Sequence, residues 1–490
     1  MPNRTFVIGV GMTHFDKPGR KKDVDYPDYV LEAATKALLD ANITYDAVEF
    51  AAVGYINADS TAGQRGLYQL GLTQIPIINV NNNCSTGSTA LYTARNTVAS
   101  GQTEVALALG FEKMNPGSLG TNFPDRVNPL DWALETMNDV RQIDPTAPFT
   151  PQIFCNAALE YGERSKNTSK DTDEAMHLIA SKSHTQSTLN PYSQFNFKAS
   201  VEDVKKARKV FGPMTLLHCS PTSDGAACCI VASEAFVVKH NLGPQAIEIT
   251  GQVMATDSTL AFDPSGIKKS CLEIAGADMT RAAVKKLYKQ TGTSPLDVSV
   301  CELHDCFFGN ELITYDALGL CPSGHAVPYT LSGATFLPKF WTSQPPPAQY
   351  HRVPVNTSGG LISKGHPLGA TGIAQCAELT WQLRGWCESR QVPNATKGLQ
   401  HNVGLGGAVV VTLYSRPSKT DTKILGANKG WKDPRERVGY NPAASCRGIS
   451  EADVRKVISK KGGLVGLPSG LKETVKEKLV KANIGGSAKL

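Results

Sequence analysis

Short apolar runs alternate with amphipathic stretches along the first hundred residues. Within 25–42, Ala34 and Leu38 fall on one helical face, and 88–94 forms a second helical stretch of small side chains. Buried strands are expected at 5–10, 47–55, 75–80 and 105–110. Such alternation is typical of a parallel sheet that helices cover on both faces.

The same pattern returns in the second half of the chain. Residues 282–287 lead into the apolar run 297–302 much as residues 33–38 lead into 46–50, a spacing of 249 (282 − 33) between the two helical segments. A repeat of this length indicates two similar α/β halves rather than a solenoid of short units. Between the halves, residues 115–215 are polar and poor in strand patterns, so a mainly helical insertion is expected there.

Composition narrows the class of protein. Hydrophobic residues make up 41% and charged residues 19%, as in ordinary globular chains. No apolar run approaches the roughly 18 residues that a membrane span needs, and the N-terminus leads directly into a strand pattern rather than a signal peptide. The twelve cysteines are scattered and contain no C-x-x-C pair, so we expect reduced thiols in an intracellular protein.

The positive charge is concentrated at the end of the chain. Residues 416–490 contain 17 Lys and Arg against 7 Asp and Glu, whereas the rest of the chain contains 33 against 37. A basic tail is found in proteins that bind nucleic acid or anionic membranes. Here the charges are dispersed and lack interleaved aromatic residues, which favours a solvated appendage and no nucleic-acid partner.

Four segments carry candidate chemistry, each where a strand gives way to a loop or helix. The first contains Cys84, at the start of the helical stretch. A cysteine at a helix N-terminus feels the positive end of the helix dipole, which lowers the thiol pKa and favours a nucleophilic thiolate. The alternative is a buried structural cysteine.

The second segment, 359–372, holds five glycines and a His-Pro step. This composition indicates a constrained loop to which another group approaches closely. His366 in this loop could take the proton from a thiol and so create the nucleophile. The alternative is a tight turn in which His366 merely begins a helix.

The third segment, 304–307, follows the apolar run 298–303 directly. His304, Asp305 and Cys306 are unfavourable to bury at a strand end without a purpose. Zinc binding by His304 and Cys306 stays open, although no second ligand pair has suitable spacing, and a purely structural network is the other alternative.

The fourth segment, 401–407, is rich in glycine and precedes the apolar run 408–411. Its backbone N–H groups could stabilise an oxyanion. The Gly-x-Gly-Gly pattern does not open a helix after a strand, so a dinucleotide site is not expected.

Together these segments resemble the thiolase superfamily from about residue 5 to residue 414. The run 83–87 around Cys84 and the Gly365-His366-Pro367 loop look like the first and third signatures of that family. The His-Asp-Cys-Phe run 304–307 is similar to the variant signature of thiolases associated with sterol carrier protein, where most thiolases have Asn-Glu-Ala-Phe. The usual C-terminal Cys-x-Gly is replaced by 402–404, again as in that subgroup.

The resemblance implies an α/β thiolase fold. Two duplicated βαβαβαββ halves would form a five-layer α-β-α-β-α core, with a helical loop domain inserted in the first half. The implied domains are an N-terminal half at 1–114 and 216–243, the loop domain at 115–215, a C-terminal half at 244–415, and a basic extension at 416–490. About 75 residues follow the core, too few for the sterol carrier domain fused to some members, so lipid transfer is not expected.

The resemblance also implies residue roles. His366 would deprotonate Cys84, the nucleophile, and Cys306 would act as the second acid and base. His304 and His366 would stabilise the enolate, and the backbone N–H groups of Cys84 and Gly404 the tetrahedral oxyanion. Acyl-CoA and CoA would be substrates of a homodimer, with no tightly bound cofactor and no metal.

The last three residues, Ala488, Lys489 and Leu490, resemble the peroxisomal targeting tripeptide of the Ser-Lys-Leu type. They predict the peroxisomal matrix as the location and the import receptor as a partner.

Two other functions stay open. A decarboxylating ketoacyl synthase shares the fold, but it has no need of a second proton-handling cysteine. A lipid-binding protein without activity would have no need of reactive side chains at strand ends.

Overall fold

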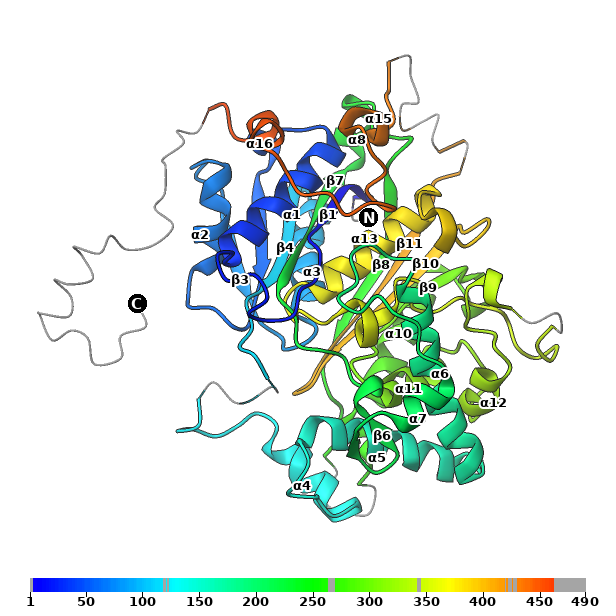
Figure 1. The fold of residues 1–490 in the computed structure, drawn as a ribbon. Helices are drawn as coiled ribbons and strands as arrows, with labels where there is room; N and C mark the ends of the chain where they lie inside the picture. Colours follow the sequence, from blue (N-terminus) through cyan, green and yellow to red (C-terminus); the bar gives the residue numbers. More distant parts are fainter. Residues whose placement is uncertain are drawn as a thin grey trace, which may run out of the picture.

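Nine strands form one mixed sheet whose order contains two matching halves (Figure 1). The computed structural model describes residues 3–461 apart from 118–119, 121–122, 263–268, 342–344, 419, 422–424 and 426–429. The strand order is β3-β2-β4-β7-β1-β8-β11-β10-β9. The strands span β1 Thr5–Met12, β2 Phe50–Gly54, β3 Ile77–Val80, β4 Val105–Glu112, β7 Gly225–Ser233, β8 Ile247–Ala255, β9 Val300–Glu302, β10 Lys397–Gly404 and β11 Ala408–Ser415.

The sheet is mixed rather than parallel. β2 runs parallel to β3 and β4, and β9 runs parallel to β10, as the alternation of strands and helices predicts. The last strand of each half turns back, so that β7 and β11 are antiparallel to their neighbours. The prediction of a parallel sheet was therefore wrong at these strands. At β11 the reason is that a short turn joins β10 to β11, where a parallel pair would need a crossover helix.

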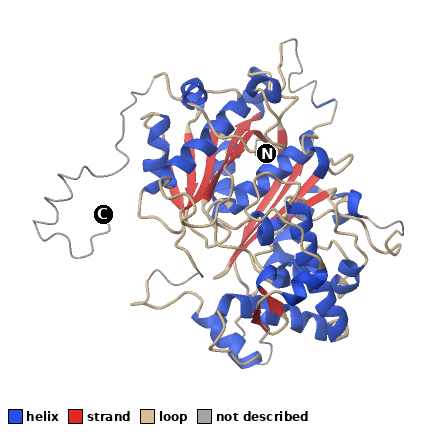
Figure 2. Ribbon diagram, viewed as in Figure 1, coloured by secondary structure: helices blue, strands red, loops and turns tan. Residues whose placement is uncertain are grey.

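The sheet has two half-sheets, β3-β2-β4-β7-β1 and β8-β11-β10-β9. Helices form three layers around them, and Figure 2 shows helices on both sides of the strands. α3 (Thr86–Ala99) and α13 (Thr371–Arg384) pack against each other between the halves. α1 (Tyr26–Ala41) covers the outer face of the first half, and α10 (Ala277–Thr291) that of the second. α13 is buried on all sides from residue 371 to 383, as expected of a central helix. The five-layer architecture is thus confirmed.

The duplication is real, but its spacing is not constant. β2 and β9 begin 250 residues apart (300 − 50), whereas α3 and α13 begin 285 apart (371 − 86). The difference arises because α11 (Phe308–Ala317), α12 (Ala326–Leu331) and the loop after them lengthen the second half. Cys301 still bridges to Val355, at the place that β3 takes beside β2.

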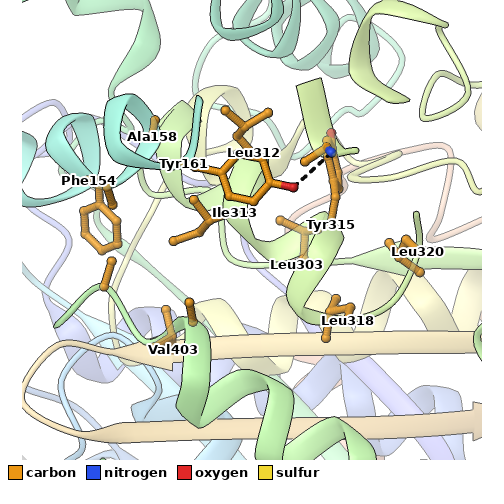
Figure 3. Packing of buried hydrophobic residues seen from close by; sticks show 14 of the residues in the cluster. Phe154, Ala158, Tyr161, Leu303, Leu312, Ile313, Tyr315, Leu318, Leu320 and Val403 are labelled. Atoms are coloured by element: carbon orange, nitrogen blue, oxygen red, sulfur yellow. Dashed lines mark hydrogen bonds between the residues drawn. The ribbon is translucent and has the colours of Figure 1, made fainter. Parts of the chain in front are cut away.

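Helices occupy the predicted insertion. They are α4 (Asp131–Val140), α5 (Phe149–Arg164), α6 (Ser169–Ser187) and α7 (Val201–Lys206), followed by a small hairpin of β5 (Lys209–Phe211) and β6 (Met214–Thr215). Figure 3 shows how Phe154 and Ala158 of α5 pack toward Leu312 and Ile313 of α11. The insertion therefore shares a hydrophobic core with the second half, while the domain boundaries themselves stay a prediction.

The remaining helices are short. They are α2 (Ala62–Leu67), α8 (Glu234–Lys239), α9 (Cys271–Ile274), a π-helix at Gly360–Lys364, and 3₁₀ turns at Tyr45–Ala47, Tyr68–Leu70, Leu216–His218, Pro295–Asp297, Pro338–Phe340 and Glu388–Arg390. In the described part of the chain, no helix has the length and apolarity to cross a bilayer. All twelve cysteines are free thiols, as expected.

The extension is not a solvated appendage up to residue 461. Its helices α15 (Pro434–Val438) and α16 (Glu451–Val457) pack on α1, above the first half in Figure 1. The backbone N–H of Ser459 donates to Leu70 O at 2.8 Å, and that of Lys460 donates to Asp46 Oδ2 at 2.7 Å. Composition misled the prediction, because it does not show that these donors find their acceptors, Leu70 and Asp46, in the first half of the fold. Residues 462–490, with the targeting tripeptide, lie outside the described residues.

Candidate active site

Cys84 lies in the turn between β3 and α3. Asn83 adopts a left-handed conformation (φ 50°), and the hydroxyl of Thr86 accepts the backbone N–H of Asn82 at 2.9 Å. This turn places Cys84 two residues before the helix, with 8% of the side chain exposed. The thiol therefore lies at the carboxyl edge of the sheet, where ligands bind in α/β folds.

The pKa of the Cys84 thiol moves opposite to the sequence-based prediction. Burial raises it to about 12, and the carboxylate of Glu112 adds to this effect. Removal from water disfavours a thiolate more strongly than the helix N-terminus favours it. The resting thiol is therefore protonated, and a base must take its proton before it can attack.

Two histidines surround this thiol. The Sγ atom of Cys84 and one ring nitrogen each of His304 and His366 lie within 4.8 Å of one another, and all three side chains are buried. The two imidazole rings are 5.2 Å apart between centroids, at an angle of 75°. Residues from three distant parts of the sequence thus form one compact cluster, as the predicted site requires.

His366 is held as a base. Its backbone N–H donates to Ser223 Oγ at 2.9 Å, and its Nδ1 lies 2.7 Å from Thr371 Oγ1. The hydroxyl of Thr371 donates its proton to Pro367 O. Thr371 Oγ1 therefore acts as the acceptor toward His366, and Nδ1 of His366 carries the proton. The Nε2 atom then carries a lone pair, and none of the residues that the structure describes forms a hydrogen bond with it. Burial lowers the pKa of His366 to about 3, which keeps the ring neutral and able to accept a proton.

The loop that carries His366 fits tightly against the first half-sheet. A Cβ atom on Gly110, in β4, would lie 1.9 Å from Gly369 O. Only glycine allows this close approach of two backbones. A Cβ atom on Gly369 itself would lie 2.5 Å from Phe111 O, so the predicted reason for the glycine-rich loop, close approach of another group, is confirmed for Gly369.

His304 and Cys306 follow β9, and both are buried. Asn402 Nδ2 lies 2.9 Å from His304 Nδ1. Burial, and next the proximity of His366, lower the pKa of His304 well below its ordinary value. Burial raises the pKa of Cys306, and Cys84 lies close enough to raise it further. Asp305 contacts the glycine-rich segment 359–372, where its Oδ1 accepts the backbone N–H of Leu361 at 2.6 Å.

Gly404 ends β10 beside the turn that holds Cys84. A Cβ atom there would lie 2.2 Å from Asn82 O, and Asn83 Nδ2 donates to Leu405 O at 3.0 Å. The strand β10 includes residues 397–404, so the fourth segment is partly strand, and its remaining glycines form the turn into β11. All four segments therefore meet at one edge of the sheet.

Sequence reasoning missed Glu112, the last residue of β4. Its buried carboxylate accepts N–H groups from Ile56, Asn57 and Gly369 at 2.8–3.0 Å, so it joins two loops beside Cys84. Burial raises its pKa to about 7. A glutamate directly after the apolar run at 105–110 was the available signal.

The metal alternative changes with the geometry. Among the described residues, the group of three ligand-type side chains that lie together is Cys84, His304 and His366, and it does not include Cys306. Cysteine and histidine are zinc ligands, but three such groups also make a thiol with its base and an oxyanion donor. The absence of a metal stays a prediction.

Comparison with known proteins agrees with this arrangement. Two family models match, "Thiolase, N-terminal domain" over residues 5–196 and "Thiolase C-terminal domain-like" over residues 268–415. Sterol carrier protein 2 of Gallus gallus is 53% identical over 416 residues, which are 85% of this chain and 72% of that relative. Non-specific lipid-transfer protein-like 2 of Caenorhabditis elegans is 44% identical over 431 residues, 86% of this chain and 98% of that relative.

More distant relatives extend the comparison. Acetyl-CoA acetyltransferase of Methanothermobacter thermautotrophicus is 32% identical over 84% of this chain and 99% of that relative. Among solved structures, the Ltp2-ChsH2(DUF35) aldolase has a TM-score of 0.67 at 20% identity, covering 86% of this chain and 99% of that one. Human mitochondrial 3-ketoacyl-CoA thiolase in complex with CoA has a TM-score of 0.57 at 19% identity, covering 85% of this chain and 98% of that one.

The two structural matches concern the fold and confirm the predicted thiolase architecture. The curated relatives add sequence identity of 53% and 44% over 85% and 86% of this chain. The chain belongs to the thiolase family and is an acyltransferase enzyme.

Proposed function

We propose that the protein is a 3-oxoacyl-CoA thiolase, an acetyl-CoA C-acyltransferase that cleaves 3-oxoacyl-CoA with a second CoA through an acyl-cysteine intermediate. The observation that carries the proposal is the cluster of a protonated thiol and two neutral imidazoles within 4.8 Å, with a second thiol nearby. This set contains a nucleophile, its base, a hydrogen-bond donor and a second group that can exchange a proton.

The first half-reaction begins at Cys84. His366 Nε2 takes the thiol proton, and the thiolate attacks the 3-keto carbon of the substrate. The C2–C3 bond then breaks, and its electron pair leaves with acetyl-CoA as an enolate, which Cys306 protonates. His304 and His366 stabilise the enolate oxygen. Cleavage through a thioester divides one difficult step into two exchanges.

The second half-reaction releases the acyl group. Cys306, now a thiolate, removes the proton from incoming CoA, whose sulfur attacks the acyl-Cys84 thioester. The backbone N–H groups of Cys84 and Gly404 stabilise the tetrahedral oxyanion. A donor placed in advance at such a point often contributes roughly 3–4 kcal/mol. Cys84 leaves as a thiolate and recovers its proton from His366.

The substrates would include 2-methyl-branched and sterol side-chain 3-oxoacyl-CoA esters. Support comes from the His-Asp-Cys-Phe run 304–307, which resembles the subgroup of thiolases associated with sterol carrier protein, and from the identity to Sterol carrier protein 2 of Gallus gallus. With a 2-methyl substrate the departing enolate would be that of propionyl-CoA. No tightly bound cofactor takes part in this scheme, and CoA is a substrate.

The direct test is thiolysis of a medium-chain 3-oxoacyl-CoA by the purified protein, measured as acetyl-CoA released with and without free CoA. Release that requires CoA supports the proposal. The second candidate is a decarboxylating 3-ketoacyl synthase-like enzyme, which shares a cysteine with two histidines. Consumption of malonyl-CoA without thiolysis would support that alternative and contradict the first.

We propose that the protein forms a homodimer through β3. β3 is the terminal strand of the sheet order, and Ile78 on it is 46% exposed. An exposed edge strand with an apolar residue is suited to pairing with a second copy. We expect light scattering after size exclusion to give about twice the 52.4 kDa chain mass. Ile78→Lys should shift it toward the monomer, and a wild-type monomer would contradict the proposal.

We also propose that the protein works in the peroxisomal matrix. Ala488, Lys489 and Leu490 would bind the import receptor, which reads such C-terminal tripeptides. A fluorescent protein fused to the N-terminus should give puncta that coincide with a peroxisomal marker. Deletion of residues 488–490 should make the signal diffuse, and unchanged puncta after deletion would contradict this role.

A further inference from the structure

We propose that Gln400, Ser88 and Asn402 form a hydrogen-bond relay that holds His304 in one tautomer, with its proton on Nε2. Asn402 is then a positioning residue, because it acts on the reaction through His304. The catalytic meaning of the relay rests on the proposed function, whereas the tautomer itself follows from the contacts alone.

The relay begins at an amide whose orientation is fixed. Gln400 Nε2 lies 2.6 Å from Gly372 O, and a backbone carbonyl only accepts hydrogen bonds. At its other end, the Oε1 atom of Gln400 accepts the hydroxyl of Tyr414 at 2.5 Å. The atom that faces Ser88 is therefore the donating nitrogen.

Ser88 accepts one hydrogen bond and donates another. Gln400 Nε2 donates to Ser88 Oγ at 3.0 Å, and Ser88 Oγ in turn donates to Asn402 Oδ1 at 2.9 Å. All three side chains are fully buried, so no water competes for these bonds. The amide oxygen of Asn402 is thereby used, and its nitrogen must face the other way.

Asn402 Nδ2 reaches His304 Nδ1 at 2.9 Å. An amide nitrogen only donates, so His304 Nδ1 must carry a lone pair. Burial lowers the pKa of His304 well below its ordinary value, and a neutral imidazole has one proton. That proton is on Nε2, the ring nitrogen that does not face Asn402.

The two histidines of the cluster thus have opposite tautomers. Thr371 accepts Nδ1–H from His366 and leaves its Nε2 as a base, whereas Asn402 donates to His304 and leaves its Nε2–H as a donor. A single thiol therefore faces one proton acceptor and one hydrogen-bond donor. The relay prevents His304 from competing with His366 for the proton of Cys84, and it aims an N–H at the place where the enolate oxygen forms.

The first test is nitrogen NMR of protein labelled at histidine, with the His304 signals assigned by their loss in His304→Gln. We expect a pyridine-type shift for Nδ1 and a pyrrole-type shift for Nε2 of His304, and the reverse pair for His366. A pyrrole-type Nδ1 of His304 would overturn the proposal, whatever the activity. The tautomer is read from the wild-type chain, and the variant serves only to assign the His304 signals.

The second test is Asn402→Asp, which replaces the donor with an acceptor. His304 Nδ1 would then be protonated, so that Nε2 carries a proton only in the doubly protonated ring. We expect kcat to fall by about 10²–10³-fold at high pH with KM nearly unchanged, and to recover as pH falls. The groups that face the ring are Cys84, His366 and His401, and all are present in both proteins.

A matched control is Asn190→Asp, which places a carboxyl group at another buried asparagine, one that donates to Ser358 O. We expect its pH profile to keep the wild-type shape. A wild-type profile in Asn402→Asp would overturn the relay. Absence of thiolysis together with the expected NMR shifts would contradict the proposed function and leave the relay standing.

Discussion

Replacement of Cys84 by alanine is expected to reduce thiolysis by roughly 10⁴–10⁶-fold, the range found when a catalytic nucleophile is removed. Without Sγ no acyl-enzyme can form, and His366 Nε2 has no thiol proton to accept. The change removes one small buried side chain, so the fold should survive. Acetyl-CoA release measures the loss, and mass spectrometry after mixing with substrate should detect an acyl adduct on the wild-type protein alone.

Cys321→Ala is the matched control for this experiment. Cys321 is a buried free thiol outside the cluster, after α11. We expect near-wild-type thiolysis and an unchanged acyl adduct. Equal activity of wild type and Cys84→Ala would mean that the acyl group is carried elsewhere, and the mechanism proposed for the cluster would be wrong.

Cys306→Ala should separate the two half-reactions. We expect an acyl adduct on Cys84 to form slowly, because the nucleophile and its base remain, while steady-state turnover falls by about 10²–10⁴-fold. The physical reason is that no group remains to protonate the enolate and then to deprotonate CoA. A single-turnover experiment followed by mass spectrometry gives the first rate, and acetyl-CoA release gives the second.

Cys219→Ala controls for the loss of a thiol near the same strand end. The backbone of Cys219 forms an isolated β-bridge with Phe307, the neighbour of Cys306. The thiol of Cys219 donates to Thr215 O. This variant should turn over close to wild type. Full turnover in Cys306→Ala would show that the second acid and base is another group.

Part of the site was predictable because its residues follow strands. Cys84 follows β3, and His304 and Cys306 follow β9, whereas His366 lies between the π-helix and α13. Parallel strands bring such ends to one edge of a sheet, so proximity followed from topology. The duplication was likewise visible in the sequence, since two halves with the same role need the same pattern.

Properties that depend on surroundings were not predictable. The pKa of Cys84 rises rather than falls because burial outweighs the helix N-terminus, and sequence alone does not give burial. The direction of the bond between Asn402 and His304 depends on partners as distant as Gly372. The docking of α16 depends on an acceptor, Asp46, that lies more than 400 residues earlier.

The docked extension also orders events during synthesis. α1 ends at residue 41 and α16 begins at residue 451, so 410 further residues (451 − 41) must be added before the first residue of α16 is present. At about 5–20 residues per second, the ribosome needs roughly 20–80 s to produce that interval. Throughout this time the face of α1 around Leu38 and Leu39 lacks α15 and α16. A nascent chain at this stage therefore exposes a face of α1 that α15 and α16 later partly cover.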